Sequence, residues 1–240
     1  MKQTESDHNN SKLKIIIFFG IIVVISVAYA TLFYYRASVK SEDPRILIVH
    51  QQHDKYDKLM KNEEYIDAMK MLDSIEATYL KFDDYKKSYE VGLIMNSKAV
   101  NWLTIALSES NDSIKLNFLD SAKVFASRSI NTLEYWIKEF THLSRNEIII
   151  KIGDNYTPDY NIFKERNLVD IINKRADDII TAQKETPKQL SIAYTNLGTV
   201  YQYIGDYKKA IHCNRKALEI WNENKTAKYN ISNLIEMPTK

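Results

Sequence analysis

An uncharged apolar run of 21 residues, 15–35, limits what the beginning of this chain can become. A helix of that length is roughly 31 Å long at about 1.5 Å per residue, which matches a bilayer hydrocarbon core of about 30 Å. A helix buried in a protein core normally keeps one polar face, and this run has none. The run therefore predicts a transmembrane helix over 15–35, preceded by a short basic tail over 1–14 and followed by a body over 36–240.

A cleaved signal peptide is the competing interpretation of the same run. Its apolar region would cover 15–27 and end at a small-x-small triplet over 28–30. Cleavage after Ala30 would leave the apolar segment 32–35 close to the new N-terminus. A retained signal anchor is therefore favoured over cleavage.

The orientation of the anchor follows from its form rather than from a count of charges. The positive-inside rule does not decide, because three basic residues precede the span and three follow it. A short basic tail before the first apolar helix favours a cytoplasmic N-terminus. We therefore expect a single-pass membrane protein whose C-terminal domain lies outside, in the periplasm or its equivalent.

The composition of the chain excludes some functions and favours a helical body. Its 33 basic and 31 acidic residues nearly balance, so no basic field for nucleic-acid binding is expected. The single cysteine, Cys213, cannot form an intramolecular disulfide. Five glycines and four prolines are few for a fold with many hairpin turns, which favours helices joined by short connections.

Apolar residues recur at three- and four-residue spacing through the body and predict an all-α fold. Capping and turn signals predict four helices in the first part of the body: over 44–61, from about 65, from the Asp83-Asp84 pair to about 107, and from about 111. Two further helices are predicted over 133–152 and 161–184. The last three are predicted from Thr186-Pro187 to 204, from 207 to about 221, and over 226–237, where the helix would cap the array. The residues 153–158 are predicted to form a loop. The run Ile148-Ile149-Ile150 has strand propensity, but it has no partner run and is expected to be the buried end of a helix.

One segment carries a repeat pattern, formed by Tyr194, Leu197, Gly198, Tyr201, Gly205, Ala210 and Ala217. The pattern resembles the tetratricopeptide repeat over about 191–224. Gly198 and Ala210 are small where two antiparallel helices would touch, and Gly205-Asp206 would form the turn between them. The pattern departs from the family at Tyr194, Asn214 and Asn222, where Trp, a large aromatic residue and proline are usual. Fainter matches cover 62–75 and 118–130, and the region 144–186 has none.

The resemblance implies a right-handed solenoid of helix pairs whose first helices line a concave groove for an extended peptide or a partner helix. It assigns five residues of the best repeat to that groove: Thr195, Asn196, Thr199, Gln202 and Tyr203. Asn196 is the most suggestive, because an amide can both donate and accept hydrogen bonds. The same five can equally be ordinary polar residues of a helix. Thr195 stands where members that grip a carboxylate carry lysine, which argues against recognition of a peptide C-terminus.

No pattern in the chain points to catalysis, a cofactor or a metal. His50 and His53 can share a helix face, but a zinc site requires a third ligand. Cys213 adjoins His212, yet neighbours on a helix point about 100° apart and do not face each other. The sequence therefore predicts a non-enzymatic, membrane-anchored scaffold that binds a protein or peptide. The alternative is a sensory or signalling module of the cell envelope that binds a small ligand and acts through a separate chain.

Overall fold

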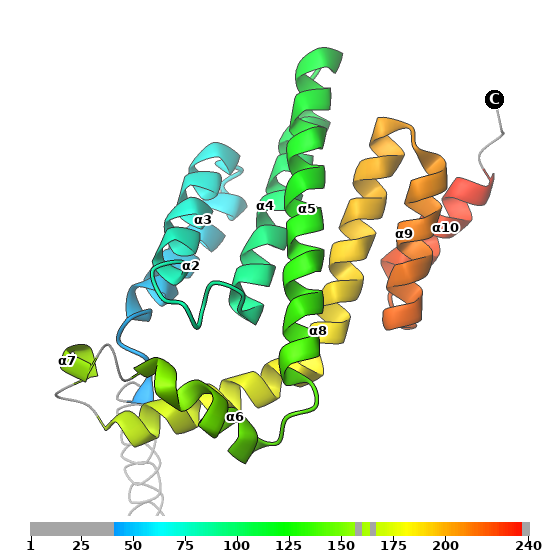
Figure 1. The fold of residues 1–240 in the computed structure, drawn as a ribbon. Coiled ribbons are helices and arrows are strands. Elements are labelled where there is room, and N and C mark those ends of the chain that lie inside the picture. Colours follow the sequence, from blue (N-terminus) through cyan, green and yellow to red (C-terminus); the bar gives the residue numbers. More distant parts are fainter. Residues whose placement is uncertain (1–40, 157–159, 164–166, 237–240) are drawn as a thin grey trace, which may run out of the picture.

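A computed structural model of the chain describes residues 41–156, 160–163 and 167–236, and all regular structure in these ranges is helical (Figure 1). The elements are α2 (Leu47–Lys61), α3 (Tyr65–Tyr79), α4 (Tyr89–Ser108), α5 (Asp112–Phe140), α6 (Arg145–Gly153), the 3-10 helix η1 (Asp154–Tyr156), α7 (Tyr160–Phe163), α8 (Leu168–Ile204), α9 (Tyr207–Ile220) and α10 (Lys225–Glu236). Within the described ranges, no helix combines the length and apolar character needed to cross a bilayer. The predicted tail and anchor over 1–35 lie outside these ranges.

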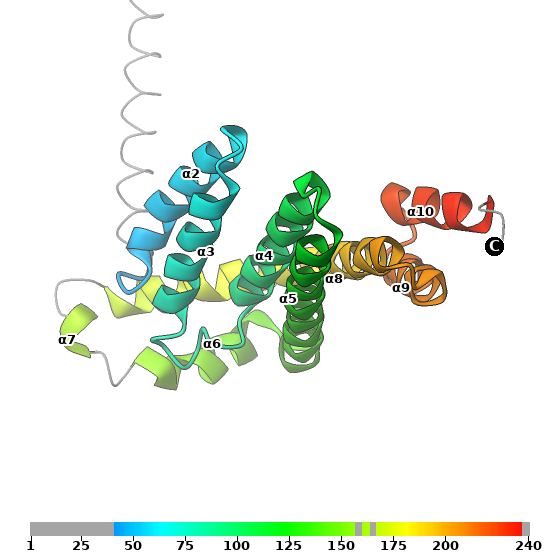
Figure 2. The ribbon, with the colours of Figure 1, turned by 90° about the horizontal axis from the view of Figure 1, so that it is seen from above.

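The helices stack as antiparallel pairs, which confirms the predicted all-α class. The pairs are α2 with α3, α4 with α5, and the C-terminal half of α8 with α9, and α10 follows (Figure 1). Seen from above, α2, α4, α8 and α10 lie toward one side of the array, and α3, α5 and α9 lie toward the other (Figure 2). This arrangement is consistent with repeats of the tetratricopeptide kind. The handedness of the solenoid remains a prediction.

The predicted single helix over 133–152 is wrong, because α5 ends at Phe140 and α6 begins at Arg145. Ser144 and Glu147 form a capping box at the new start: the Ser144 backbone N–H donates to the Glu147 carboxylate at 2.7 Å. The isoleucine run is helical, as predicted, and lies in α6. Ile148 is fully buried, but Ile150 is 76 % exposed, so only one side of the run faces the core.

The predicted helix start at Thr186-Pro187 is also wrong, because α8 continues through both residues for 37 residues. Instead, the helix changes direction between its yellow and its orange part (Figure 1). Proline removes the backbone hydrogen bond to the carbonyl four residues earlier, which bends a helix. The Thr186 hydroxyl donates to the Ala182 carbonyl at 2.5 Å, and the Gln183 amide donates to the carbonyls of the turn after α5. These contacts hold the bend in place.

Asp84, which was predicted to lie at a helix start, is held together with Asp43 by one buried arginine. The Arg45 guanidinium donates to Asp43 at 2.7 Å and to Asp84 at 2.9 Å, while Ser88 caps α4 and α2 begins only at Leu47. The carbon at the centre of the guanidinium lies 4.6 Å from the centroid of the Tyr156 ring. The cluster thereby joins the first described residues to the loop before α4 and to η1.

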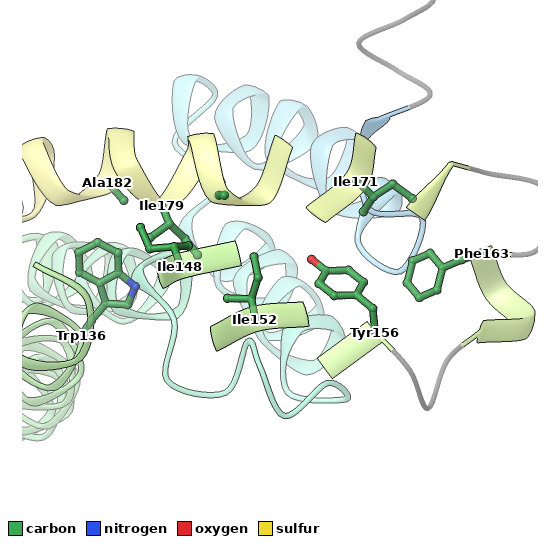
Figure 3. Close-up of a cluster of buried hydrophobic side chains, with 9 residues drawn as sticks. Trp136, Ile148, Ile152, Tyr156, Phe163, Ile171, Ile179 and Ala182 are labelled. Atoms are coloured by element: carbon green, nitrogen blue, oxygen red, sulfur yellow. The ribbon is translucent and has the colours of Figure 1, made fainter. Parts of the chain in front are cut away.

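The segment between α5 and the bend of α8 is a helical insertion with a core of its own (Figure 3). It lies between the second and the third helix pair, where the sequence shows no repeat. Side chains from α5, α6, η1, α7 and α8 form this core: Trp136, Ile148, Ile152, Tyr156, Phe163, Ile171, Ala176, Ile179 and Ala182. The insertion packs on the end of α5 through Trp136, so it belongs to the same packed body.

The close contact predicted at Gly198 gives a stability test. A Cβ atom at this position would lie 2.5 Å from Asn214 Nδ2 and 3.1 Å from the Ala210 carbonyl oxygen. We therefore expect Gly198→Ala to lower the free energy of unfolding by about 1–3 kcal/mol through overpacking, measured by chemical denaturation of the full chain. Gly153→Ala is the matched control, because a Cβ there meets nothing within 4 Å. Equal effects of the two substitutions would contradict the close contact.

Candidate partner-binding face

The five residues predicted to line a groove all lie on the C-terminal half of α8, and the structure places them in different surroundings. Thr195 is only 3 % exposed. Its hydroxyl donates to the Ser191 carbonyl at 3.0 Å and accepts from Asn224 Nδ2 at 3.0 Å. Asn224 caps the start of α10, since its side chain accepts from the Ala227 backbone N–H at 3.0 Å. Thr195 is thus a packing contact between α8 and α10, which corrects its assignment to an open groove.

Thr199 lies one turn further along the same stripe of α8 and also contacts α10. Its hydroxyl donates to the Thr195 carbonyl at 3.1 Å and accepts from Asn230 Nδ2 at 3.4 Å. The same Asn230 amide donates to Asn214 Oδ1 at 3.2 Å, while Asn214 Nδ2 donates to the Ala210 carbonyl at 2.8 Å. Asn214 is fully buried. Its departure from the aromatic residue usual in the repeat is therefore balanced by satisfied hydrogen bonds.

Asn196 connects the third helix pair to the second. Its Nδ2 donates to Asn96 Oδ1 on α4 at 2.9 Å, and both side chains are half-buried. This bond uses one donor of Asn196 and one acceptor of Asn96. Within the described part of the chain, Asn196 Oδ1 and Asn96 Nδ2 form no hydrogen bond. Asn196 Oδ1 can therefore still accept, and Asn96 Nδ2 can still donate, hydrogen bonds to another molecule.

Gln202 and Tyr203 lie at the end of α8, where the chain turns into α9. Gln202 is half-buried, and Tyr203 is 47 % exposed. The turn has the predicted form: Gly205 ends α8 with a left-handed φ of 90°, which favours glycine, and Asp206 caps α9. Tyr203 is thus a large exposed side chain next to a well-defined turn.

Six of the seven residues of the predicted repeat signature serve the packing around α8 and α9, and the seventh, Gly205, forms the turn between them. Leu197, Gly198, Ala210 and Ala217 are buried, and Tyr194 and Tyr201 pack against the apolar cluster that contains Leu197. The Tyr194 hydroxyl also donates to Glu134 on α5 at 2.7 Å. Burial and this bond raise the pKa of Tyr194 above its usual range. The signature therefore builds the scaffold of the face and does not itself offer a binding surface.

A cavity of about 540 Å³ lies at the other end of the α8–α10 contact. It is lined from α8 by Lys188 and Ile192, from the end of α9 by Trp221, and from the start of α10 by residues 223–226 and Lys228. Lys188 Nζ lies 5.7 Å from the centroid of the Trp221 ring. No local sequence pattern predicts this cavity, because its lining residues on α8 and α10 are more than 30 residues apart in the chain.

The groups considered for chemistry are not assembled into a reactive site. Burial raises the pKa of the Cys213 thiol to about 11, which keeps it protonated and unreactive at neutral pH. Burial lowers the pKa of His53. In the part of the chain that the structure describes, no three His, Cys, Asp or Glu side chains are grouped to hold a metal ion.

Comparison with known proteins identifies one repeat. A family model for the tetratricopeptide repeat matches residues 191–224, the segment predicted from the sequence. Comparison with curated proteins and with solved structures finds no match. The match covers the C-terminal half of α8, all of α9 and the turn that leads into α10. Repeats of this family typically bind proteins and are typically non-catalytic.

Proposed function

We propose that this chain is a membrane-anchored scaffold that binds a peptide or a partner helix on the side of α4, α8 and α10. The stacked helix pairs and the matched tetratricopeptide repeat support a role in protein–protein interaction. The observation that carries the proposal is the amide pair of Asn196 and Asn96. Its remaining acceptor and donor can bind the N–H and C=O groups of an extended peptide backbone.

Tyr203 supplies the apolar part of this proposed contact. Tyrosine is enriched at binding hot spots because it buries a large ring and keeps a polar hydroxyl at its end. Asn196 and Tyr203 both lie on α8, seven residues apart, which is two helical turns. A partner segment laid along α8 would therefore reach both.

Anchoring by residues 15–35 would hold this face next to the membrane and raise the local concentration of membrane-bound partners. The uncharged 21-residue run supports this part of the proposal. A reporter enzyme that is active on only one side of the membrane, fused to the C-terminus, tests the orientation. Activity of an exported reporter is expected for a cytoplasmic N-terminus, and activity of only a cytoplasmic reporter would contradict it.

The binding face is tested by site-specific crosslinking in native membranes. A photoreactive amino acid in place of Tyr203 is expected to capture a defined partner, and the additional substitution Asn196→Ala should weaken the capture. The matched control replaces Tyr135 on α5, which is similarly exposed at 41 % but lies outside the proposed face. Equal capture from both positions would count against the proposed face, and so would capture that Asn196→Ala leaves unchanged.

A sensory module that binds a small ligand is the second candidate, and one observation favours it. A cavity of about 380 Å³ lies between the loop before α4, the end of α5, α6 and α8, with Tyr135, Trp136, Lys87 and Lys151 among its lining residues. This volume is within the usual range for ligand pockets, about 300–1,000 Å³. A small molecule that raises the melting temperature of the chain, and fails to do so after a substitution in this cavity, would favour the sensor over the scaffold.

A further inference from the structure

Three lysines surround the 540 Å³ cavity at the α8–α10 contact. Lys188, Lys225 and Lys228 line the cavity, and within the described residues none of them forms an ion pair. Glu223 is the one carboxylate among the lining residues. The cavity therefore carries an excess of positive charge without an internal partner.

Two of these charges lie at the start of α10, where the helix dipole disfavours a cation. The first turn of α10 contains no acidic residue, although carboxylates are the favoured charges at a helix N-terminus. Lys225 and Lys228 lie in this turn instead. The positive charges of neighbouring lysines repel one another, and an anionic ligand bound between these lysines would reduce the repulsion.

The lining of the cavity also includes two apolar side chains and one hydrogen-bonded asparagine. Ile192 and Trp221 are half-buried. Asn224 is buried, and its amide donates to Ser191 at 2.8 Å and to Thr195 at 3.0 Å. Asn224 is therefore held in place before any ligand binds, so ordering it costs little entropy on binding.

We propose that this cavity binds an acidic segment of a protein partner, with its carboxylates on Lys188, Lys225 and Lys228 and an apolar side chain against Trp221. The inference deepens the proposed function and rests on it, because the cavity continues the α8–α10 face on which the partner would lie. Charge complementarity specifies the acidic character of the segment. Three lysines around a hollow are fewer than the clusters of about four to eight basic residues that bind anionic lipid surfaces. A peptide is therefore favoured over a membrane.

The test uses the full chain and labelled peptides in a fluorescence anisotropy titration. The probe is a peptide of alternating glutamate and leucine, and its counterpart has glutamine in place of every glutamate. The acidic peptide is expected to bind at least about tenfold more tightly than the glutamine peptide, and the difference should shrink as salt increases. Equal binding of the two peptides would overturn the proposal.

Charge reversal locates the contact. The double variant Lys225→Glu, Lys228→Glu is expected to weaken binding of the acidic peptide by about tenfold or more. The matched control is Lys208→Glu combined with Lys184→Glu, two exposed lysines that do not line the cavity and form no ion pair within the described residues. This control makes the same change in net charge and should leave the affinity within about twofold. Equal losses in the two double variants would show a nonspecific charge effect and overturn the assignment.

Two further measurements separate the possible failures. Cooperative thermal melting of each variant shows that the variant is folded, so that a loss of affinity cannot be attributed to unfolding. Vesicles with and without anionic lipid are titrated in parallel, and binding to anionic vesicles without binding to the acidic peptide would assign the lysines to a membrane instead. If crosslinking at Tyr203 captures a partner while the acidic peptide does not bind, the scaffold stands and this inference fails. If the peptide binds at the lysines while Tyr203 captures nothing, the α8 face of the proposed function fails.

Discussion

Arg45→Ala is expected to lower the free energy of unfolding by about 3–5 kcal/mol, the usual cost of removing one partner of a buried ion pair. Arg45 and Asp43 are both buried, and Asp84 accepts from the same guanidinium. The Tyr85 hydroxyl donates to Asp43 at 3.2 Å but cannot neutralise its charge. Without Arg45, the two carboxylates would lose the cation that binds both of them, and only the more indirect charge of Arg175 would still act on Asp84. Chemical denaturation of the full chain measures the loss.

The effect of Arg45→Ala should also depend on pH. Burial raises the pKa of Asp84 above its usual value, although Arg45 opposes the rise. Removing Arg45 would raise this pKa further, so the folded variant would bind a proton at a higher pH than the unfolded chain does. A group with a raised folded pKa loses its contribution to stability as the pH rises through that value. The free energy of unfolding of the variant should therefore lie closer to that of the parent chain at pH 5 than at pH 7.

Arg145→Ala is the control for this prediction. Arg145 donates to Asp177 at 2.6 Å, but both side chains are exposed. Exposed ion pairs contribute about 0–1 kcal/mol, so the control should change stability little and with no marked dependence on pH. A deficit of the same size in both variants would show that burial of the Arg45 cluster is not the cause.

Trp136→Ala is expected to lower the free energy of unfolding by about 3–5 kcal/mol, as much as Arg45→Ala. Trp136 is 1 % exposed and lies at the point where α5 meets the insertion (Figure 3). Its ring packs between Tyr89, at 5.8 Å between ring centroids, and Phe140, at 5.3 Å. Truncation would leave a cavity between α5, α6 and α8, and the insertion would lose one of its contacts with the helix pairs. Loss of stability is measured by denaturation, and loosening of the insertion is measured by the rate of limited proteolysis.

The neighbouring residue provides the control for Trp136. Tyr135 is 41 % exposed and contacts Lys87, whose Nζ lies 4.6 Å from the centroid of the tyrosine ring. Such a contact at an exposed site contributes about 0.5–1 kcal/mol, so Tyr135→Ala should cost no more than that. If the two substitutions cost the same, the core of the insertion does not depend on Trp136.

Local patterns explain why much of the fold could be predicted. The all-α class and most helix positions follow from apolar spacing and from capping residues, which act within one or two turns. The repeat over 191–224 and its turn at Gly205 were predicted for the same reason, because Gly198, Ala210 and Ala217 lie close together in the chain. The separation of α5 from α6 was also readable, since Ser144 and Glu147 have the spacing of a capping box.

The other errors arise where packing outweighs a local signal. Pro187 bends α8 without ending it, because the helix packs against apolar clusters on both sides of the proline. Asp84 is of a residue type that often caps helices, but its carboxylate instead binds Arg45, which lies 39 residues away in the chain. Thr195 occupies a position of the repeat that usually lines the groove, but here α10 packs over it.

The sequence by itself determined the helical class, the tetratricopeptide repeat and the prediction of an anchor over 15–35, because each depends on residues within one helix or one hairpin. Only the tertiary structure decided which side chains meet. It joined Asn96 to Asn196, 100 residues apart, and brought Lys188 next to the first turn of α10. The physical reason is that a helix specifies its own face through its period, whereas the contacts between helices depend on how all of them pack together.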